Sequence, residues 1–405
     1  MSDAAPRPRV ACVSVSAALG GSEWVLLDFA ARAAALGLDP TVVLPKSGPL
    51  GEALSAAGVA VAVAPADDAF LEASQRSLLT AEGLLRFGRG VARWSKAIGD
   101  AVAPLATPAG PKAILYSNGF KAHLACALLR GHAHVWHVHE FPPDRLALVW
   151  RTLAAALPDA RIANSRAVAD AWELAGFGKC DVVSNGVDLA RFTSAPKTFW
   201  IHDQLALSHD ARLIGMPAVF ARWKGHLKVV EAFERAAARL EDVHLVLVGG
   251  PIYDTVAEKG YAEELVRRVR RSSASSHGGP PALSDRIHFV KFHPEPWRLY
   301  PEFDLVVHFS LRPEPFGRVI TEAMASGVPV IAADAGGPRE IVEDGVTGWR
   351  VPSGDVVALS DRMISALASD TTAMRAAARR AAEERFSADR FAREVADVLK
   401  GMAAK

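Results

Sequence analysis

Short apolar runs alternate with longer stretches of helical periodicity along the whole chain, and this alternation restricts the possible folds more than any other feature. The runs before residue 140 lie at 10–16, 40–45, 59–65, 113–117 and 134–138. Those after residue 210 lie at 212–216, 243–250, 287–292, 304–309 and 328–333. Strands that alternate with helices form parallel sheets, because each helix returns the chain to the edge where the previous strand began. The sequence therefore predicts an α/β fold with two doubly wound, Rossmann-like sheets.

The length of 405 residues also predicts two domains, since single hydrophobic cores stop growing at about 250–300 residues. A turn-rich segment, 184–196 (SNGVDLARFTSAP), separates the two sets of runs and is the expected linker. We therefore expect an N-terminal domain over 1–188 and a C-terminal domain over 189–388. A second polar segment, 271–285, is rich in Gly, Pro and Ser and is predicted to be a mobile loop.

Composition and charge exclude several classes of protein. Half of the residues are hydrophobic and 22% are charged, as in folded globular proteins, and the net charge of +1 gives no general attraction to nucleic acid. The three cysteines form no CxxC pair, which indicates a reducing compartment. The apolar run at 10–19 is too short to cross a bilayer. We expect a cytoplasmic protein with at most peripheral contact at the inner membrane face.

The predicted helix over 86–102 has a basic side that allows two interpretations. Its basic side chains are Arg86, Arg89, Arg93 and Lys96. Such a face could contact lipid head groups or an anionic acceptor. However, Glu82 and Asp100 share it, four residues from Arg86 and Lys96 respectively. Paired charges usually serve solubility, so the pattern favours a solvated surface.

Several phosphate-binding motifs are absent from the sequence. It contains neither GxGxxG nor GxxxxGK[ST], which excludes the dinucleotide fingerprint and the P-loop. It also has no DxD pair of aspartates to hold a divalent ion. A phosphorylated ligand would therefore need basic side chains and backbone amides for charge compensation, and we expect neither a cofactor nor a divalent metal.

The segment 312–354 carries the most informative chemistry. Glu314 and Glu322 stand eight residues apart, on either side of Gly317, which lets the chain turn into a helix. The N-terminus of that helix would offer free amides and a positive dipole to a phosphate. Glu314 could accept hydrogen bonds from sugar hydroxyls, and Glu322 could hold a ribose diol. The alternative is that each carboxylate only complements the helix dipole.

This segment and several others resemble the family 4 retaining glycosyltransferases. PEPFGRVITEAMASGVPVIA followed by GGPREIVEDGVTGWRVPSGD is similar to the family signature. The opening VSVSAALGGSEWVLLDFAARAAALG, the loop RWKGH, the strand HLVLVGG and the closing FSADRFAREVADVLK resemble further family segments. The resemblance implies a GT-B fold, in which two Rossmann-like domains face each other across a cleft. It also implies that the C-terminal helix, 389–405, crosses back to the first domain.

The resemblance assigns roles to individual residues. Glu314 would hold the donor sugar, Lys224 would neutralise the diphosphate, and His139 would contact the sugar from the first domain. The remaining donor-binding positions are Gly21, Arg222, Gly250, Phe292, Phe316, Gly317, Val319, Ile320 and Glu322. Among these, the glycines and the Phe316, Val319 and Ile320 positions would act through the backbone. Glu322 would hold the ribose, and the base would lie near Gly250 and Phe292.

Four histidines in HAHVWHVHEF suggest a metal site at first sight. On a strand, His132 and His134 would face one side and His137 and His139 the other, which prevents one four-ligand site. We therefore favour His139 as a polar group at the strand end and His137 as its packed neighbour.

The chain departs from the family pattern at one position. Family members usually carry an arginine five residues before the lysine of the Lys-Gly pair, where this chain has Val219. Arg222 is the nearest candidate to supply a guanidinium to the diphosphate. Alternatively Arg222 is a solvated loop residue, and Arg318 or the helix amides compensate.

The expected function is transfer of a hexosyl group from a nucleotide diphosphate sugar, UDP- or GDP-linked, to an acceptor hydroxyl with retention. Such a reaction would serve polysaccharide, glycolipid or glycoconjugate biosynthesis. The alternatives are another GT-B enzyme, such as a sugar phosphorylase or sugar-phosphate synthase, and a non-catalytic binding module. The sequence leaves open the nucleotide, the sugar, the acceptor and the oligomeric state.

Overall fold

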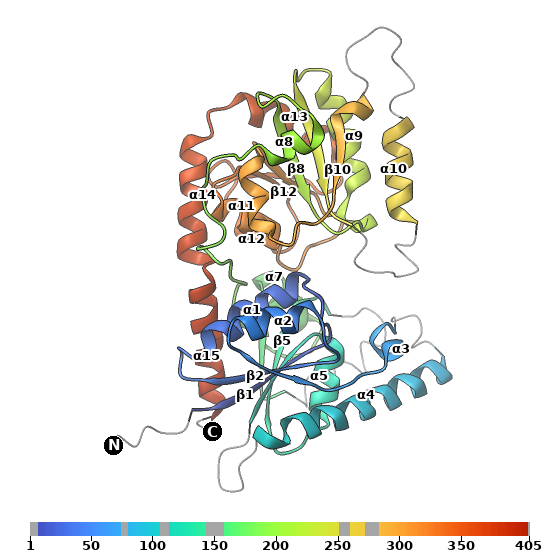
Figure 1. Cartoon of the computed structure of the whole chain (residues 1–405), viewed down its shortest axis with the longest axis vertical. Helices are drawn as coiled ribbons and strands as arrows, with labels where there is room; N and C mark the ends of the chain where they lie inside the picture. The colour runs from blue at the N-terminus through green and yellow to red at the C-terminus, as the bar shows by residue number, and fades with distance from the viewer. Residues whose placement is uncertain are drawn as a thin grey trace. The chain divides into compact units, whose positions relative to one another are not determined.

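The computed structural model describes residues 7–73, 80–105, 113–142, 158–250, 260–271 and 283–403 (Figure 1). The chain divides into two compact units. Unit 1 comprises Met1–Gly186 and Ala388–Lys405, and unit 2 comprises Val187–Ser387. Each unit has its own parallel sheet, which confirms the predicted α/β class.

Unit 1 contains a seven-stranded parallel sheet in the order β3-β2-β1-β4-β5-β6-β7. Its strands are β1 (Arg9–Ser14), β2 (Asp39–Leu44), β3 (Ala60–Val63), β4 (Ile114–Asn118), β5 (Ala133–Val138), β6 (Ala160–Ala163) and β7 (Asp181–Val182). Its helices are α1 (Gly21–Ala33), α2 (Pro49–Ala56), α3 (Asp68–Leu71), α4 (Ala81–Val102), α5 (Phe120–Ala127), α7 (Arg166–Leu174) and α15 (Ala388–Ala403). The strand order reverses between β1 and β4, and open α/β sheets bind ligands at such points.

Both faces of the unit 1 sheet are buried, because helices cover each of them. Along β1, Val10 and Cys12 join a core cluster with α1 and α15. Ala11 and Val13 point the other way, into a cluster with α4, α5 and α7. Figure 1 shows α4 and α5 side by side on that second face. The continuous apolar run of this strand follows from burial on both sides.

Unit 2 contains a six-stranded parallel sheet in the order β10-β9-β8-β11-β12-β13. Its strands are β8 (Arg212–Pro217), β9 (Val243–Val248), β10 (Ile287–Val290), β11 (Leu305–His308), β12 (Val330–Ala333) and β13 (Trp349–Val351). Its helices are α8 (Trp200–Leu205), α9 (His226–Ala237), α10 (Tyr261–Arg271), α11 (Arg318–Ala325), α12 (Pro338–Ile341), α13 (Val356–Ala368) and α14 (Thr372–Arg385). The order reverses between β8 and β11, so the residues that follow these two strands are the natural site candidates.

The faces of the unit 2 sheet are covered in the same way. Leu213 and Val306 belong to a cluster with α11 and α14, whereas Ile214 and Val307 belong to one with α9 and α13. Every apolar run that the sequence marked as a strand overlaps one in the structure. The sequence pattern did not predict β6, β7 or β13. Each of these strands is short and includes a charged residue, and β7 has only two residues.

The basic side of α4 is a solvated surface with paired charges, as predicted. Arg86 Nη2 lies 2.5 Å from Glu82 Oε1, and Lys96 Nζ lies 3.0 Å from Asp100 Oδ2. All four side chains are at least 71% exposed. Most of the polar segment predicted as a mobile loop, residues 272–282, lies outside the described residues. Among the helices within the described ranges, none is long and apolar enough to cross a membrane.

Candidate functional site

The loop between β11 and α11 is shaped by three glycines. Gly317 has φ +102°, a left-handed conformation that a residue with a side chain rarely adopts, and α11 begins directly after it. A Cβ on Gly336 would lie 2.3 Å from the carbonyl oxygen of Glu314, so the two backbones can approach only without a side chain. Gly337 then donates its amide to the same carbonyl over 2.8 Å. The glycine pair of the GGP sequence thus fixes the position of Glu314.

Glu314 and Lys224 form the central ion pair of unit 2. Lys224 Nζ lies 2.7 Å and 2.9 Å from the two carboxylate oxygens, and the side chains are only 15% and 12% exposed. Ser310 Oγ donates to Glu314 Oε2 over 2.7 Å, and His308 Nε2 lies 3.4 Å from the same oxygen. Burial acts to raise the pKa of Glu314, but the Lys224 charge and His308 outweigh it and hold this pKa well below its usual range. The carboxylate is therefore charged at neutral pH.

Glu322 lies one turn into α11 and is held from two sides. Tyr300 Oη donates to Glu322 Oε2 over 2.5 Å. Arg318 places Nε at 3.1 Å and Nη2 at 3.0 Å from Oε1. The Glu322 side chain is 10% exposed, so both carboxylates of the predicted site are mostly buried and paired.

The amides at the start of α11 are only partly available. The Ile320 amide donates to the Gly317 carbonyl over 2.9 Å, in a tight turn that closes the helix start. Helix geometry leaves the Val319 amide without an acceptor inside the helix. Phe316 is buried, with 4% exposure, and belongs to the apolar cluster that contains Ile320. A phosphate at this terminus would thus meet the Val319 amide more readily than that of Ile320.

Arg222 is engaged with α10. Its Nη2 lies 2.5 Å from Glu264 Oε2, and its guanidinium lies 4.9 Å from the centre of the Tyr261 ring. The side chain is 48% exposed. Arg222 is therefore paired with Glu264 on α10, whereas Arg318 lies beside Glu322.

Gly250 and Phe292 follow the neighbouring strands β9 and β10. Among the described residues, a Cβ on Gly250 would meet no atom within 4 Å, whereas one on Gly249 would lie 2.0 Å from the Ala218 carbonyl. The Gly250 carbonyl accepts from the Phe220 amide over 3.1 Å. Phe292 is 42% exposed. The two predicted base contacts therefore follow the carboxyl ends of adjacent parallel strands in the unit 2 sheet.

Gly21 and His139 belong to unit 1. Gly21 is the first residue of α1, and His139 follows the last residue of β5. The rings of His137 and His139 lie 3.9 Å apart between centres, so these two share a face as predicted. His132 precedes β5, so the alternation argument does not extend to it. In the part of the chain that the structure describes, no three His, Cys, Asp or Glu side chains are grouped to hold a metal ion.

Three contributors to the site were not predicted from the sequence. His308 ends β11 and Ser310 follows two residues later, and this spacing could have indicated that the two side chains share one side of the chain. Tyr300 is 22 residues from Glu322 and gave no such signal.

The fold and these residues define a protein class. Two doubly wound units, with cations and carboxylates gathered at a helix start on the second sheet, are typical of the GT-B class. A model described as "Glycosyl transferases group 1" matches residues 200–385, and one described as "Glycosyltransferase Family 4" matches residues 19–191. The chain belongs to the family 4 glycosyltransferases, with the GT-B fold.

Curated relatives and solved structures agree with this family. The chain is 34% identical over 201 residues to a D-inositol 3-phosphate glycosyltransferase of Mycolicibacterium gilvum (strain PYR-GCK), which covers 50% of this chain and 42% of the relative. This chain therefore spans less than half the length of that relative. Anabaena HepE in complex with UDP and glucose is 25% identical, with a TM-score of 0.78 and coverage of 97% and 100%. Sucrose-phosphate synthase of Thermosynechococcus elongatus, at 21% identity, TM-score 0.75 and coverage of 98% and 100%, shares the fold.

Proposed function

We propose that this protein transfers a hexosyl group from a nucleotide diphosphate sugar to an acceptor hydroxyl, with retention at the anomeric carbon and without a divalent metal. The observation that carries the proposal is the mostly buried Lys224–Glu314 pair beside the start of α11. A buried cation at a helix N-terminus suits a diphosphate, and a carboxylate beside it suits sugar hydroxyls.

Lys224 can serve both groups at once. An ammonium has three donors, and two of them are directed at the oxygens of Glu314, at 2.7 Å and 2.9 Å. The third can contact a phosphate oxygen without loss of the pair. Lys224 would then bridge the carboxylate that holds the sugar and the diphosphate that leaves. Because the two side chains are mostly shielded from solvent, the Lys224 ammonium would act on the leaving group with little screening.

The proposed step is a displacement on one face of the sugar. The bond from the anomeric carbon to the diphosphate oxygen breaks, and the bond to the acceptor oxygen forms on the same face. The acceptor proton passes to the departing diphosphate, so that no covalent enzyme nucleophile is needed. Lys224 and the α11 amides stabilise the negative charge that develops on the diphosphate.

The donor and the acceptor are proposed from the compared proteins. The HepE structure contains UDP and glucose, which favours a UDP-linked hexose among the candidates. The name of the Mycolicibacterium gilvum relative indicates an acceptor of the inositol phosphate type. A phosphorylated polyol is therefore the first acceptor to test with this chain.

The test is an assay of nucleoside diphosphate release. Purified protein would be incubated with UDP-glucose, UDP-N-acetylglucosamine or GDP-mannose, each with and without inositol phosphate. We expect acceptor-dependent release from one donor, and a product whose anomeric configuration matches that donor by NMR. No release from any donor would refute a transferase, and an inverted product would refute retention. Sugar transfer to inorganic phosphate instead would indicate a phosphorylase.

A further inference from the structure

Tyr300 reaches Glu322 from outside the motif that predicted the site. It is the first residue of the short 3-10 helix η6 (Tyr300–Glu302), which precedes β11. Its hydroxyl donates to Glu322 Oε2 over 2.5 Å, and the residue is 1% exposed. Burial, and then the charge of Glu322, raise the pKa of this phenol well above its ordinary value. The hydroxyl therefore stays protonated and remains a donor.

The remaining hydrogen-bonding capacity of Glu322 lies on the oxygen that Tyr300 contacts. A carboxylate accepts about four hydrogen bonds, two on each oxygen. Arg318 Nε and Nη2 lie 3.1 Å and 3.0 Å from Oε1 and use that oxygen. Tyr300 uses one position on Oε2, which leaves one position there for a ligand hydroxyl. The direction of that position depends on the Tyr300 hydrogen bond.

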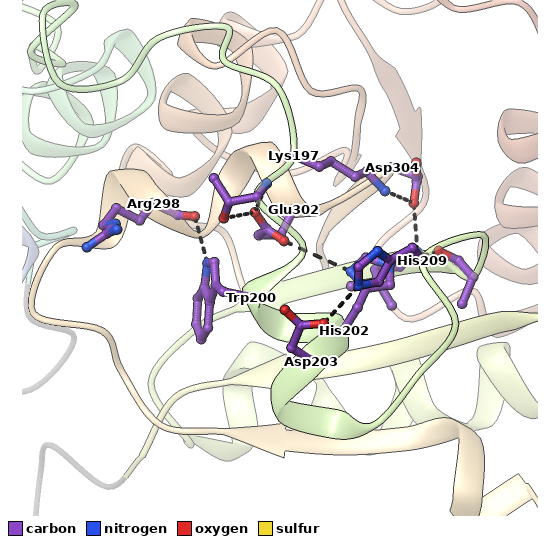
Figure 2. Close-up of polar contacts among 11 residues, drawn as sticks. Lys197, Trp200, His202, Asp203, His209, Arg298, Glu302 and Asp304 are labelled. Atoms are coloured by element: carbon purple, nitrogen blue, oxygen red, sulfur yellow. Dashed lines mark hydrogen bonds and ion pairs between the residues drawn. The ribbon is translucent and has the colours of Figure 1, made fainter.

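The turn that carries Tyr300 is itself anchored by the carboxylates of Glu302 and Asp304 (Figure 2). Glu302 is 0% exposed, and its Oε1 accepts from Thr198 N and Oγ1, each over 2.8 Å. Asp304 Oδ2 accepts from Lys197 Nζ over 2.7 Å and from the Leu213 amide over 2.8 Å. These contacts tie the turn to the segment around α8 and to β8. The phenol is thus presented to Glu322 from a fixed support.

We propose that Tyr300 is a positioning residue of the nucleotide site, which aims Glu322 Oε2 at a ribose hydroxyl. The inference rests on the proposed function, because it takes Glu322 as the ribose ligand. Tyr300 acts through Glu322 and not by contact with the nucleotide. Its loss should therefore weaken nucleotide binding and leave the chemical step nearly unchanged.

Tyr300→Phe tests this role, because it removes only the hydroxyl. We expect titration calorimetry with UDP and GDP to show about tenfold weaker binding of the preferred nucleotide, which corresponds to about 1.4 kcal/mol. The donor KM should rise by a similar factor, with kcat within about twofold of wild type. Tyr116→Phe is the matched control, since that phenol is 1% exposed and hydrogen bonds with His137 Nδ1 over 2.5 Å in unit 1. It should lower the melting temperature similarly and leave nucleotide affinity unchanged.

A double-mutant cycle separates positioning from general stability. In a Glu322→Ala background, Tyr300→Phe should cause no further loss of nucleotide affinity. An equal loss in both backgrounds would overturn the inference, and so would unchanged affinity in Tyr300→Phe beside weakened binding in Glu322→Ala. Wild-type protein that binds no nucleoside diphosphate would instead overturn the proposed function, and this inference with it.

Discussion

Each unit buries a glutamate near the start of a helix, and the surroundings of the two carboxyl groups differ. Glu23, in the first turn of α1 in unit 1, is 6% exposed and accepts from the Ser22 hydroxyl over 3.0 Å. Burial raises the pKa of Glu23 despite its hydrogen bonds. Glu314 in unit 2 faces the Lys224 ammonium, and its pKa is lowered. A cation at 2.7 Å thus reverses the effect that burial alone would have.

The comparison indicates where an anionic ligand would bind. Two histidines of unit 1, His123 and His137, are buried and uncharged at neutral pH, because burial lowers the pKa of His123 to about 3 and that of His137 well below its ordinary value. Unit 2 holds Lys224 and Arg318 as buried or half-buried cations. We infer that the charge of the diphosphate is compensated in unit 2.

The largest effect should come from loss of the unit 2 cation. Lys224→Met should lower kcat at least a hundredfold, since one electrostatic contact to developing charge is typically worth about 10²–10³ in rate. It should also destabilise the fold by about 3–5 kcal/mol, because Glu314 loses its buried partner. Steady-state kinetics and urea denaturation measure the two effects. Lys228→Met is the control, because Lys228 is 45% exposed and pairs with Glu231; equal kinetics in both variants would contradict the assignment.

The two carboxylates should separate binding from turnover. Glu322→Ala should weaken nucleotide binding by about ten- to a hundredfold, the equivalent of about 1.5–3 kcal/mol for a charge-assisted hydrogen bond. Glu314→Ala should leave nucleotide affinity near wild type and lower turnover by a similar factor. Calorimetry with the preferred nucleotide measures the affinity, and initial rates with the corresponding nucleotide sugar measure the turnover. Wild-type behaviour of both variants would remove both residues from the site.

The difference between the units could be predicted only in part from the sequence. Apolar runs such as 243–250 predicted the buried strands, because parallel strands covered on both faces are continuously hydrophobic. They did not predict β6 or β13, where Arg161 and Arg350 interrupt the run. Glu314 and Glu322 lie inside one continuous motif and were predicted from it. The contacts of Tyr300 with Glu322 and of Arg222 with Glu264 join residues 22 and 42 positions apart, and depend on tertiary packing that local pattern does not specify.

A smaller effect is expected at the position that departs from the family pattern. If Arg222 supplies a guanidinium to the diphosphate in place of the residue lost at Val219, Arg222→Ala should lower turnover about tenfold, equivalent to about 1.4 kcal/mol. Glu264→Ala breaks the same exposed pair but keeps the guanidinium, and should retain activity. Unchanged kinetics in Arg222→Ala, beside an impaired Lys224→Met, would assign the compensation to Lys224 with Arg318 or the α11 amides.

The buried glutamates should respond to pH with opposite signs. The pKa of Glu314 is lower in the folded protein than in the unfolded chain, where it is near 4.5. The ionised carboxylate therefore stabilises the fold above about pH 4.5, and this stabilisation is lost as the pH falls through the folded-state pKa. Glu314→Gln should therefore lower the melting temperature at pH 7, and the loss should shrink below about pH 4. The pKa of Glu23 is higher in the folded protein than in the unfolded chain. Its protonated carboxyl therefore stabilises the fold at low pH, and this stabilisation is lost as the pH rises through the folded-state pKa. Glu23→Gln should thus raise the melting temperature at pH 7 and have no effect at low pH; shifts of the same sign would refute the contrast.

The smallest expected effect concerns divalent metal. We expect Lys224, Arg318 and the α11 amides to compensate the diphosphate charge without a divalent ion, so EDTA should leave kcat and the donor KM unchanged. The matched assay adds Mg²⁺ or Mn²⁺ after chelation, with the Lys224→Met variant in parallel. If the unit 2 cations replace the ion, metal should not stimulate the wild type. Activity that EDTA abolishes and Mg²⁺ or Mn²⁺ restores in the wild type would show that these cations do not suffice. If Mg²⁺ or Mn²⁺ raised the activity of Lys224→Met but not of the wild type, the added ion would be replacing the missing Lys224 charge. That result would support charge compensation by the unit 2 cations.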